Sequence, residues 1–315
     1  MGNMGRLIDG RWSTGDLGPD AKGKYIRRAA KFRTQISADK SADFPAEADR
    51  YHLYVSHACG WSHRALIFRV LKGLEDVVSV SFMQDHMGEA GWIFEDGSDV
   101  LGDRQKLYQL YVAAQCDYTG RVSVPVLWDK LGCSIVSNES TDIIASFDKA
   151  FPEFDNGSPT LYPEALADEI KDMVERNYQA VNNGVYRCGF AGSQGAYDEA
   201  AALLFERLDQ LEEILAQKRY LLGDAMTGAD WSLFPTLYRF DAVYYIHFKC
   251  SRRQLRDYPN LWAYTRELYQ QPGVAGTCKM DRIRAHYYTS HESIHPRGII
   301  PLAPDIDFDE PHGRG

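Results

Sequence analysis

The chain has 315 residues, of which 44% are hydrophobic and 25% are charged, and its formal net charge is −9 at pH 7. This length allows two domains of ordinary size, each with its own core, and the composition is that of a soluble globular protein. The negative charge argues against a nucleic-acid-binding protein, which would carry a basic patch. No apolar run of about 18 residues is present, so we expect no membrane span and no membrane partner.

The cysteines and histidines give no sign of a disulfide framework or a metal centre. The cysteines form no Cys-x-x-Cys pair, so we expect reduced thiols in a cytoplasmic protein. Residues 1–12 also lack the basic and then apolar pattern of a secretory signal peptide. His286, His291 and His295 lie close together in sequence, but no cysteine or carboxylate pattern completes a metal site, and no metal is expected. The six cysteines are Cys59, Cys116, Cys133, Cys188, Cys250 and Cys278.

Residues 1–50 are poor material for a hydrophobic core. They are rich in Gly, Lys, Arg and Asp, with isolated apolar residues such as Trp12, Tyr25 and Phe32. We therefore expect an extended arm that lies over the surface and is held by its aromatic side chains.

The first strand–helix unit places a cysteine where its thiol could be reactive. Tyr51, Leu53 and Val55 alternate with other residues and predict a short half-buried strand, whereas residues 65–71 fit one face of a helix. Cys59 lies between them, at the helix start, where unpaired N–H groups and the positive end of the dipole favour a thiolate. The alternative is a small buried apolar residue, as free cysteines often are. The local pattern alone leaves both interpretations open.

A second β-rich run covers residues 77–82, and a long polar and aromatic insertion with a Gly-Trp-Ile-Phe segment at residues 91–94 follows it. Residues 122–129 then form a strand that Pro125 interrupts. Because proline cannot donate to a ladder, Pro125 must lie at an edge or a bulge, or face a ligand.

Glu139 and Ser140 fall at the start of the next helix. Residues 135–136 predict a last short strand, and residues 142–150 are helical. A helix start offers N–H groups and a dipole that can hold a carboxylate ligand. The alternative is an N-cap that satisfies only its own helix.

Beyond a linker dense in turn formers, the periodicity becomes helical. Residues 166–181 and 197–215 predict two helices, and Thr227 to Asp230 has the spacing of a capping box. The acidic tail from Asp305 is expected to be loose. The predicted parts are an N-terminal extension, an α/β domain, a linker and a helical domain with a C-terminal extension, at residues 1–50, 51–150, 151–163 and 164–315.

The segment Cys59-Gly60-Trp61-Ser62-His63-Arg64 resembles the Cys-Pro-Trp-Ala-His-Arg motif of the glutathionyl-hydroquinone reductases, the Xi class of the glutathione transferase superfamily. Residues 184–191, 233–250 and 286–301 resemble further motifs of this family. The resemblance covers about residues 5 to 303. It implies an α/β N-terminal thioredoxin-like domain, an all-α C-terminal domain and a homodimer.

The resemblance also implies a reaction. The Cys59 thiolate would attack the sulfur of a glutathionyl-hydroquinone, release the hydroquinone and leave a protein–glutathione mixed disulfide. A second glutathione would then release oxidised glutathione. Glutathione is thus a co-substrate, and neither a metal nor a flavin is required.

Family positions that bind glutathione match residues spread over the α/β domain, and positions that line the acceptor pocket match two tyrosines whose hydroxyls could donate to a quinol oxygen. The Val124-Pro125 bond is expected to be cis, so that Val124 presents its backbone to glutathione. Each tyrosine has the alternative of an ordinary core position, and Arg121 that of a surface arginine. The matched residues are Trp92, Arg121, Val124, Glu139 and Ser140 for glutathione, and Tyr186 and Tyr287 for the pocket.

Two positions depart from the family motif. Gly60 replaces proline and leaves the first helical turn looser, and Ser62 replaces alanine and adds a hydroxyl that could donate to the Cys59 sulfur. A broader omega-like deglutathionylase or dehydroascorbate reductase remains an alternative. So does a non-catalytic protein that binds glutathione or another ligand.

Overall fold

The computed structural model describes residues 5–15, 18–97, 99–154 and 156–314. Contacts between residues separate the chain into two compact units. Both units are discontinuous in sequence, because each contains a segment from near each end of the chain. The domain limits expected from the sequence stay a prediction. The first unit comprises Met1–Leu17, Arg28–Pro159 and Thr277–Ile300, and the second comprises Gly18–Arg27, Thr160–Gly276 and Pro301–Gly315.

The first unit is built on a four-stranded sheet of β3 (Tyr51–Val55), β4 (Ser79–Phe82), β6 (Val126–Asp129) and β7 (Ser134–Ser137). The strand order is β4-β3-β6-β7. Strands β3 and β4 are parallel, whereas β6 is antiparallel to both β3 and β7. A mixed sheet of this order agrees with the predicted thioredoxin-like fold.

Strand β3 is buried on both faces, so the prediction of a half-buried strand is wrong. The ring nitrogens of His52 lie 2.8 and 2.9 Å from the hydroxyl oxygens of Ser79 and Ser81. The Tyr54 hydroxyl donates to Asp99 at 2.7 Å. These hydrogen bonds allow the polar side chains of β3 to lie in the interior.

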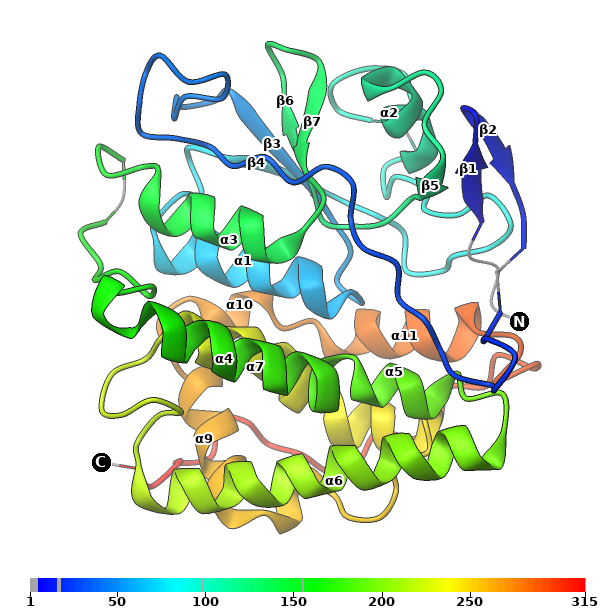
Figure 1. The fold of residues 1–315 in the computed structure, drawn as a ribbon, viewed down its shortest axis with the longest axis vertical. Helices are drawn as coiled ribbons and strands as arrows, with labels where there is room; N and C mark the ends of the chain where they lie inside the picture. The colour runs from blue at the N-terminus through cyan, green and yellow to red at the C-terminus, as the bar shows by residue number, and fades with distance from the viewer. Residues whose placement is uncertain (1–4, 16–17, 98, 155, 315) are drawn as a thin grey trace. The chain divides into compact units, whose positions relative to one another are not determined.

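Helices α1 (Gly60–Leu71) and α3 (Ser140–Lys149) pack against each other beside this sheet (Figure 1). Helix α1 follows β3 and α3 follows β7. Because β3 and β7 run in the same direction, both helices start at one edge of the sheet, where the antiparallel β6 also begins. Near the ends of the two helices, buried Lys72 pairs with buried Asp148 at 3.6 Å.

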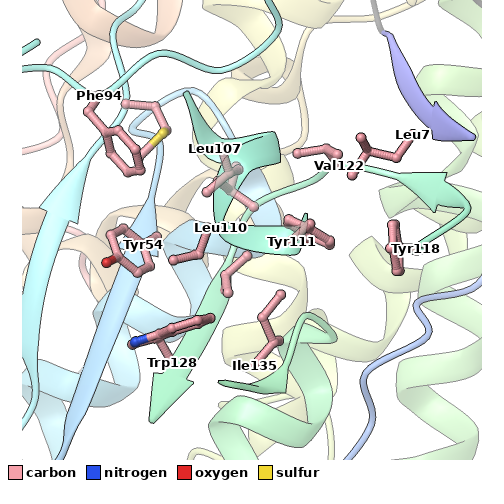
Figure 2. Close-up of a cluster of buried hydrophobic side chains, with 13 residues drawn as sticks. Leu7, Tyr54, Phe94, Leu107, Leu110, Tyr111, Tyr118, Val122, Trp128 and Ile135 are labelled. Atoms are coloured by element: carbon pink, nitrogen blue, oxygen red, sulfur yellow. The ribbon is translucent and has the colours of Figure 1, made fainter. Parts of the chain in front are cut away.

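Helix α2 (Leu107–Ala114) lies in the long insertion and packs on the sheet through an apolar cluster. Figure 2 shows Leu107 and Leu110 of α2 beside Tyr54 of β3 and Trp128 of β6. The insertion is therefore part of the core of the first unit.

The N-terminal arm forms strands. β1 (Arg6–Ile8), β2 (Arg11–Ser13) and β5 (Gly120–Arg121) make a second, antiparallel sheet with the order β2-β1-β5. As expected, aromatic side chains hold the arm, because Trp12 stacks on Tyr108 with ring centroids 4.9 Å apart. Contrary to expectation, the arm also contributes fully buried Leu7 to the apolar cluster (Figure 2).

The second unit is helical, as predicted. The Ser193 side chain caps α6 by accepting from the backbone N–H of Ala196. Thr227 and Asp230 form the predicted capping box, in which the Thr227 N–H donates to Asp230 at 2.7 Å. Over the described ranges, no helix has the length and apolar character needed to cross a membrane. The helices of this unit are η1 (Glu164–Leu166), α4 (Ala167–Asn177), η2 (Tyr178–Asn182), α5 (Gly184–Gly189), α6 (Gln194–Gln217), α7 (Gly228–Arg239), η3 (Phe240–Tyr244), α8 (Tyr245–His247), η4 (Leu255–Asp257) and α9 (Pro259–Tyr269).

Helix α10 (Val274–Thr277) leads along the chain to α11 (Met280–Ser290), which belongs to the first unit. The tail after it returns to the second unit, so the prediction of a loose tail is wrong. Phe308 packs on Tyr238, with ring centroids 4.8 Å apart. Arg314 donates to the buried carboxylate of Glu267 at 2.8 Å.

Candidate active site

Cys59 is the N-cap residue of α1, as the sequence predicted. Its Sγ accepts from the backbone N–H of Ser62 at 3.4 Å and lies 3.3 Å from the carbonyl oxygen of Val124, to which the thiol donates. The first turn of α1 contains no acidic side chain. The positive end of the helix dipole and a backbone donor thus act on the sulfur, and both stabilise negative charge there.

The contact from Ser62 to the sulfur comes from its backbone. The Ser62 hydroxyl instead accepts from the Ser56 N–H at 3.4 Å and is buried. Within the described part of the chain, the Ser62 hydroxyl therefore does not make the expected hydrogen bond to the Cys59 sulfur. An alanine at this position would keep the same backbone donor.

The Val124-Pro125 bond is cis, as expected, and precedes β6 at the sheet edge where α1 starts. Val124 belongs to the apolar cluster that contains α2, and both Cys59 and Trp92 pack against this cluster. Three of the candidate residues are therefore held by one core.

Glu139 is the N-cap residue of α3. Its carboxylate accepts from the Thr141 N–H at 3.4 Å and from the Thr141 hydroxyl at 3.3 Å, and the neighbouring Ser140 is buried. This is the geometry of the capping alternative. The helix start at which a ligand carboxylate could bind is nevertheless where the sequence predicted it.

Tyr111 does not stand out in the sequence, but its fully buried side chain links two parts of the site through the hydroxyl. It donates to the Ser123 carbonyl at 2.8 Å and accepts from the Asn138 side chain at 3.0 Å. Ser123 precedes Val124, and Asn138 precedes Glu139. Burial raises the pKa of Tyr111, so the hydroxyl keeps its proton. A tyrosine on the apolar face of a helix looks like any core residue in sequence, which is why it was missed.

Trp92 and Tyr287 each contact the ring of His286. The Trp92 ring stacks on the His286 ring, with centroids 5.1 Å apart and an interplanar angle of 12°. The Tyr287 ring meets the His286 ring edge-on at 5.5 Å, and Tyr287 is buried. Trp92 remains partly exposed. In the sequence, His286 belongs to a group of histidines and to a segment that resembles the family, and neither pattern indicates its contact with Trp92.

The remaining two candidates are Arg121 and Tyr186. Arg121 is in β5, opposite Arg6 of β1, and its carbonyl accepts from Tyr118 at 3.0 Å. Tyr186 is in α5 of the second unit, whereas the other candidate residues belong to the first. The guanidinium carbon of Arg27 lies 4.7 Å from the Tyr186 ring centroid. No group of three or more His, Cys, Asp or Glu residues within the described ranges could hold a metal ion.

Two family models match the chain. The model for the glutathione S-transferase N-terminal domain matches residues 58–150, and the model for the C-terminal domain matches residues 194–267. The chain is also 50% identical to glutathionyl-hydroquinone reductase YqjG of Escherichia coli, with 99% of this chain and 98% of the relative covered. Glutathionyl-hydroquinone reductase PcpF of Sphingobium chlorophenolicum is 46% identical, with 96% of each chain covered.

The chain belongs to the glutathionyl-hydroquinone reductases, the Xi class of the glutathione transferases. Solved structures agree. The glutathione-bound structure of Escherichia coli YqjG matches this Xi-class chain with a TM-score of 0.90 and 48% identity, covering 98% of this chain and 99% of that one. The Xi-class transferase of Natrialba magadii matches with a TM-score of 0.94 and 45% identity, covering 99% and 97%.

Proposed function

We propose that this chain reduces S-glutathionyl-hydroquinones to hydroquinones, with glutathione as the reductant and Cys59 as the nucleophile. The observation that carries the proposal is the Cys59 sulfur at the start of α1, 3.4 Å from a backbone donor. Two relatives at 46% and 50% identity over nearly the whole chain bear the name of this activity.

The proposed reaction has two steps, a reductive cleavage of the aryl thioether and a thiol–disulfide exchange. The Cys59 thiolate attacks the sulfur of the substrate, an S–S bond forms and the aryl C–S bond breaks. The electron pair of that bond passes to the ring, which leaves as the carbanion equivalent of a keto tautomer and takes up a proton to become the hydroquinone. A glutathione thiolate then attacks the glutathione sulfur of the mixed disulfide, which restores the Cys59 thiolate and releases oxidised glutathione. No metal or flavin takes part.

Glutathione would bind along the sheet edge at which α1 and α3 begin. The start of α3, with Glu139 and Ser140, would hold the γ-glutamyl end, and the backbone of Val124 would pair with the peptide. For Glu139, this requires its carboxylate to exchange a contact with Thr141 for the ligand ammonium. Trp92 and Arg121 would contact the rest of the molecule.

The hydroxyls of Tyr186 and Tyr287 would donate to the quinol oxygens and stabilise the charge that develops there. A homodimer and a cytoplasmic location remain predictions from the family resemblance and from the cysteine pattern.

The test is turnover of glutathionyl-menadiol with glutathione. Free menadiol and oxidised glutathione should appear in equal amounts with the wild type, and Cys59→Ser should lose at least about 1000-fold in rate, because a serine hydroxyl cannot replace the thiolate nucleophile. Mass spectrometry should find one glutathione on Cys59 when substrate is added without excess glutathione.

Cys116→Ser is the matched control, since Cys116 is an exposed cysteine. It should keep the wild-type rate. Wild-type inactivity on the quinol adduct, together with activity on a small glutathione mixed disulfide or on dehydroascorbate, would replace the proposal by the broader omega-like activity. Glutathione binding without turnover of any of these three substrates would indicate a non-catalytic protein that binds glutathione.

A further inference from the structure

One face of α11 holds the loop that carries Trp92. Arg282, His286 and Ser290 are spaced by four residues, so they lie on the same side of the helix. The Ser290 hydroxyl accepts from the Met87 N–H at 2.9 Å. The Nδ1 of His286 lies 2.7 Å from the Asp85 carbonyl and donates to it, because a carbonyl oxygen can only accept.

Arg282 binds both ends of the same loop. Its Nε lies 2.5 Å from the Asp85 carboxylate and its Nη2 lies 2.6 Å from the Glu95 carboxylate. Within the loop, the Gln84 N–H donates to the Ile93 carbonyl at 2.9 Å, which brings its two sides together. The loop is therefore fixed to α11 by two ion pairs and two hydrogen bonds to its backbone.

The His286 ring completes this arrangement by covering one face of Trp92. The near-parallel stacking leaves the indole partly exposed, so the uncovered surface is available to a ligand. His286 itself is buried, and burial lowers its pKa to about 4, so a neutral ring makes the contact at neutral pH. A neutral imidazole carries a single N–H, which the hydrogen bond to the Asp85 carbonyl satisfies, and its ring can stack without a counter-ion.

We propose that His286 is a positioning residue for glutathione, acting through Trp92, whose indole plane it fixes while Arg282 and Ser290 hold the loop. The inference rests on the proposed function, in which Trp92 contacts glutathione. His286 touches neither substrate nor sulfur in this scheme. Its effect should therefore appear in glutathione affinity and in KM for glutathione, with kcat little changed.

The test measures the Kd of glutathione by calorimetry for His286→Ala and His286→Phe. His286→Ala should weaken binding by about two- to tenfold, the range expected for loss of one aromatic contact. His286→Phe keeps a ring against Trp92 and should recover at least half of the loss on a logarithmic scale. Asp281→Asn, at an exposed position of the same helix, is the control and should bind like the wild type.

A double-mutant cycle decides whether His286 acts through Trp92. In a Trp92→Ala background, His286→Ala should cause no further loss. The same loss in both backgrounds, or unchanged affinity in His286→Ala, would overturn the proposal. If His286→Ala does not fold, His286→Leu takes its place in both backgrounds, because leucine fills the space but cannot stack on the Trp92 ring. Because the readout is binding, a chain that binds glutathione without reducing quinol adducts would refute the reductase and leave this inference standing.

Discussion

At the scale of single residues, the Tyr111 hydroxyl joins two backbone segments that the proposed glutathione site uses. It lies in the interior of the first unit and bonds to Ser123, beside the cis-proline bend, and to Asn138, beside the start of α3. A single oxygen atom therefore couples the position of Val124 to that of Glu139.

Tyr111→Phe should lower both stability and glutathione affinity. Removing the hydroxyl leaves a buried carbonyl and a buried amide without this partner, which costs about 1–3 kcal/mol. Urea unfolding should show the lost stability, and KM for glutathione should rise more than kcat falls. Tyr118→Phe is the matched control, because its hydroxyl makes one bond, to the Arg121 carbonyl. Equal losses in the two variants would contradict a special role for Tyr111.

At the scale of elements, β3 combines an apolar sequence with a histidine that is buried. Burial lowers the pKa of His52 to about 4, an effect that Asp99 opposes and that Lys130 and Arg69 reinforce. The two serine hydroxyls of β4 bond to its ring and accommodate the neutral form. The folded strand thus favours the uncharged imidazole.

The protein should lose stability as the pH falls from about 6.5 to about 4. His52 has a lower pKa when folded than when unfolded, so the unfolded chain binds the proton first. Its contribution is complete above the unfolded pKa and is lost as the pH falls toward the folded one, by up to about 3 kcal/mol. Urea midpoints at pH 7 and pH 5 check this. His52→Gln should show a shallower pH dependence than the wild type, and an identical slope would count against the assignment.

At the scale of the whole molecule, both ends of the chain are built into the two units. Within the second unit, the tail is held by Phe308 and by Arg314. Burial alone would raise the pKa of Glu267, but hydrogen bonds from Tyr220, Arg219 and Arg314 hold it below its ordinary value. The carboxylate is therefore ionised, and the tail supplies part of its charge compensation.

Phe308→Ala should destabilise the protein by about 2 kcal/mol, less than the loss of a fully buried phenylalanine because the side chain is only partly buried. Thermal unfolding measures the change. Leu302→Ala is the control, since Leu302 is 95% exposed and should have almost no effect. A tail that contributes nothing would give the same melting temperature for both variants.

The local features of the site could be predicted from the sequence alone. Cys59 at the start of α1, Glu139 at the start of α3 and the Thr227–Asp230 capping box depend on residues within one helical turn, so their patterns are readable along the chain. The cis bond before Pro125 followed from the family resemblance. The binding roles of the individual residues stay predictions.

Which distant side chains support that site depends on how the elements pack in three dimensions. His286 meets Asp85 across 201 positions of sequence, and Tyr54 meets Asp99 across 45. No periodicity records such pairs, because they form only when separate elements pack. For the same reason the sequence could not predict the burial of β3, the anchoring of the tail or the hold of α11 on the Trp92 loop. Local hydrogen bonding sets where an element begins, whereas packing between elements sets what its side chains touch.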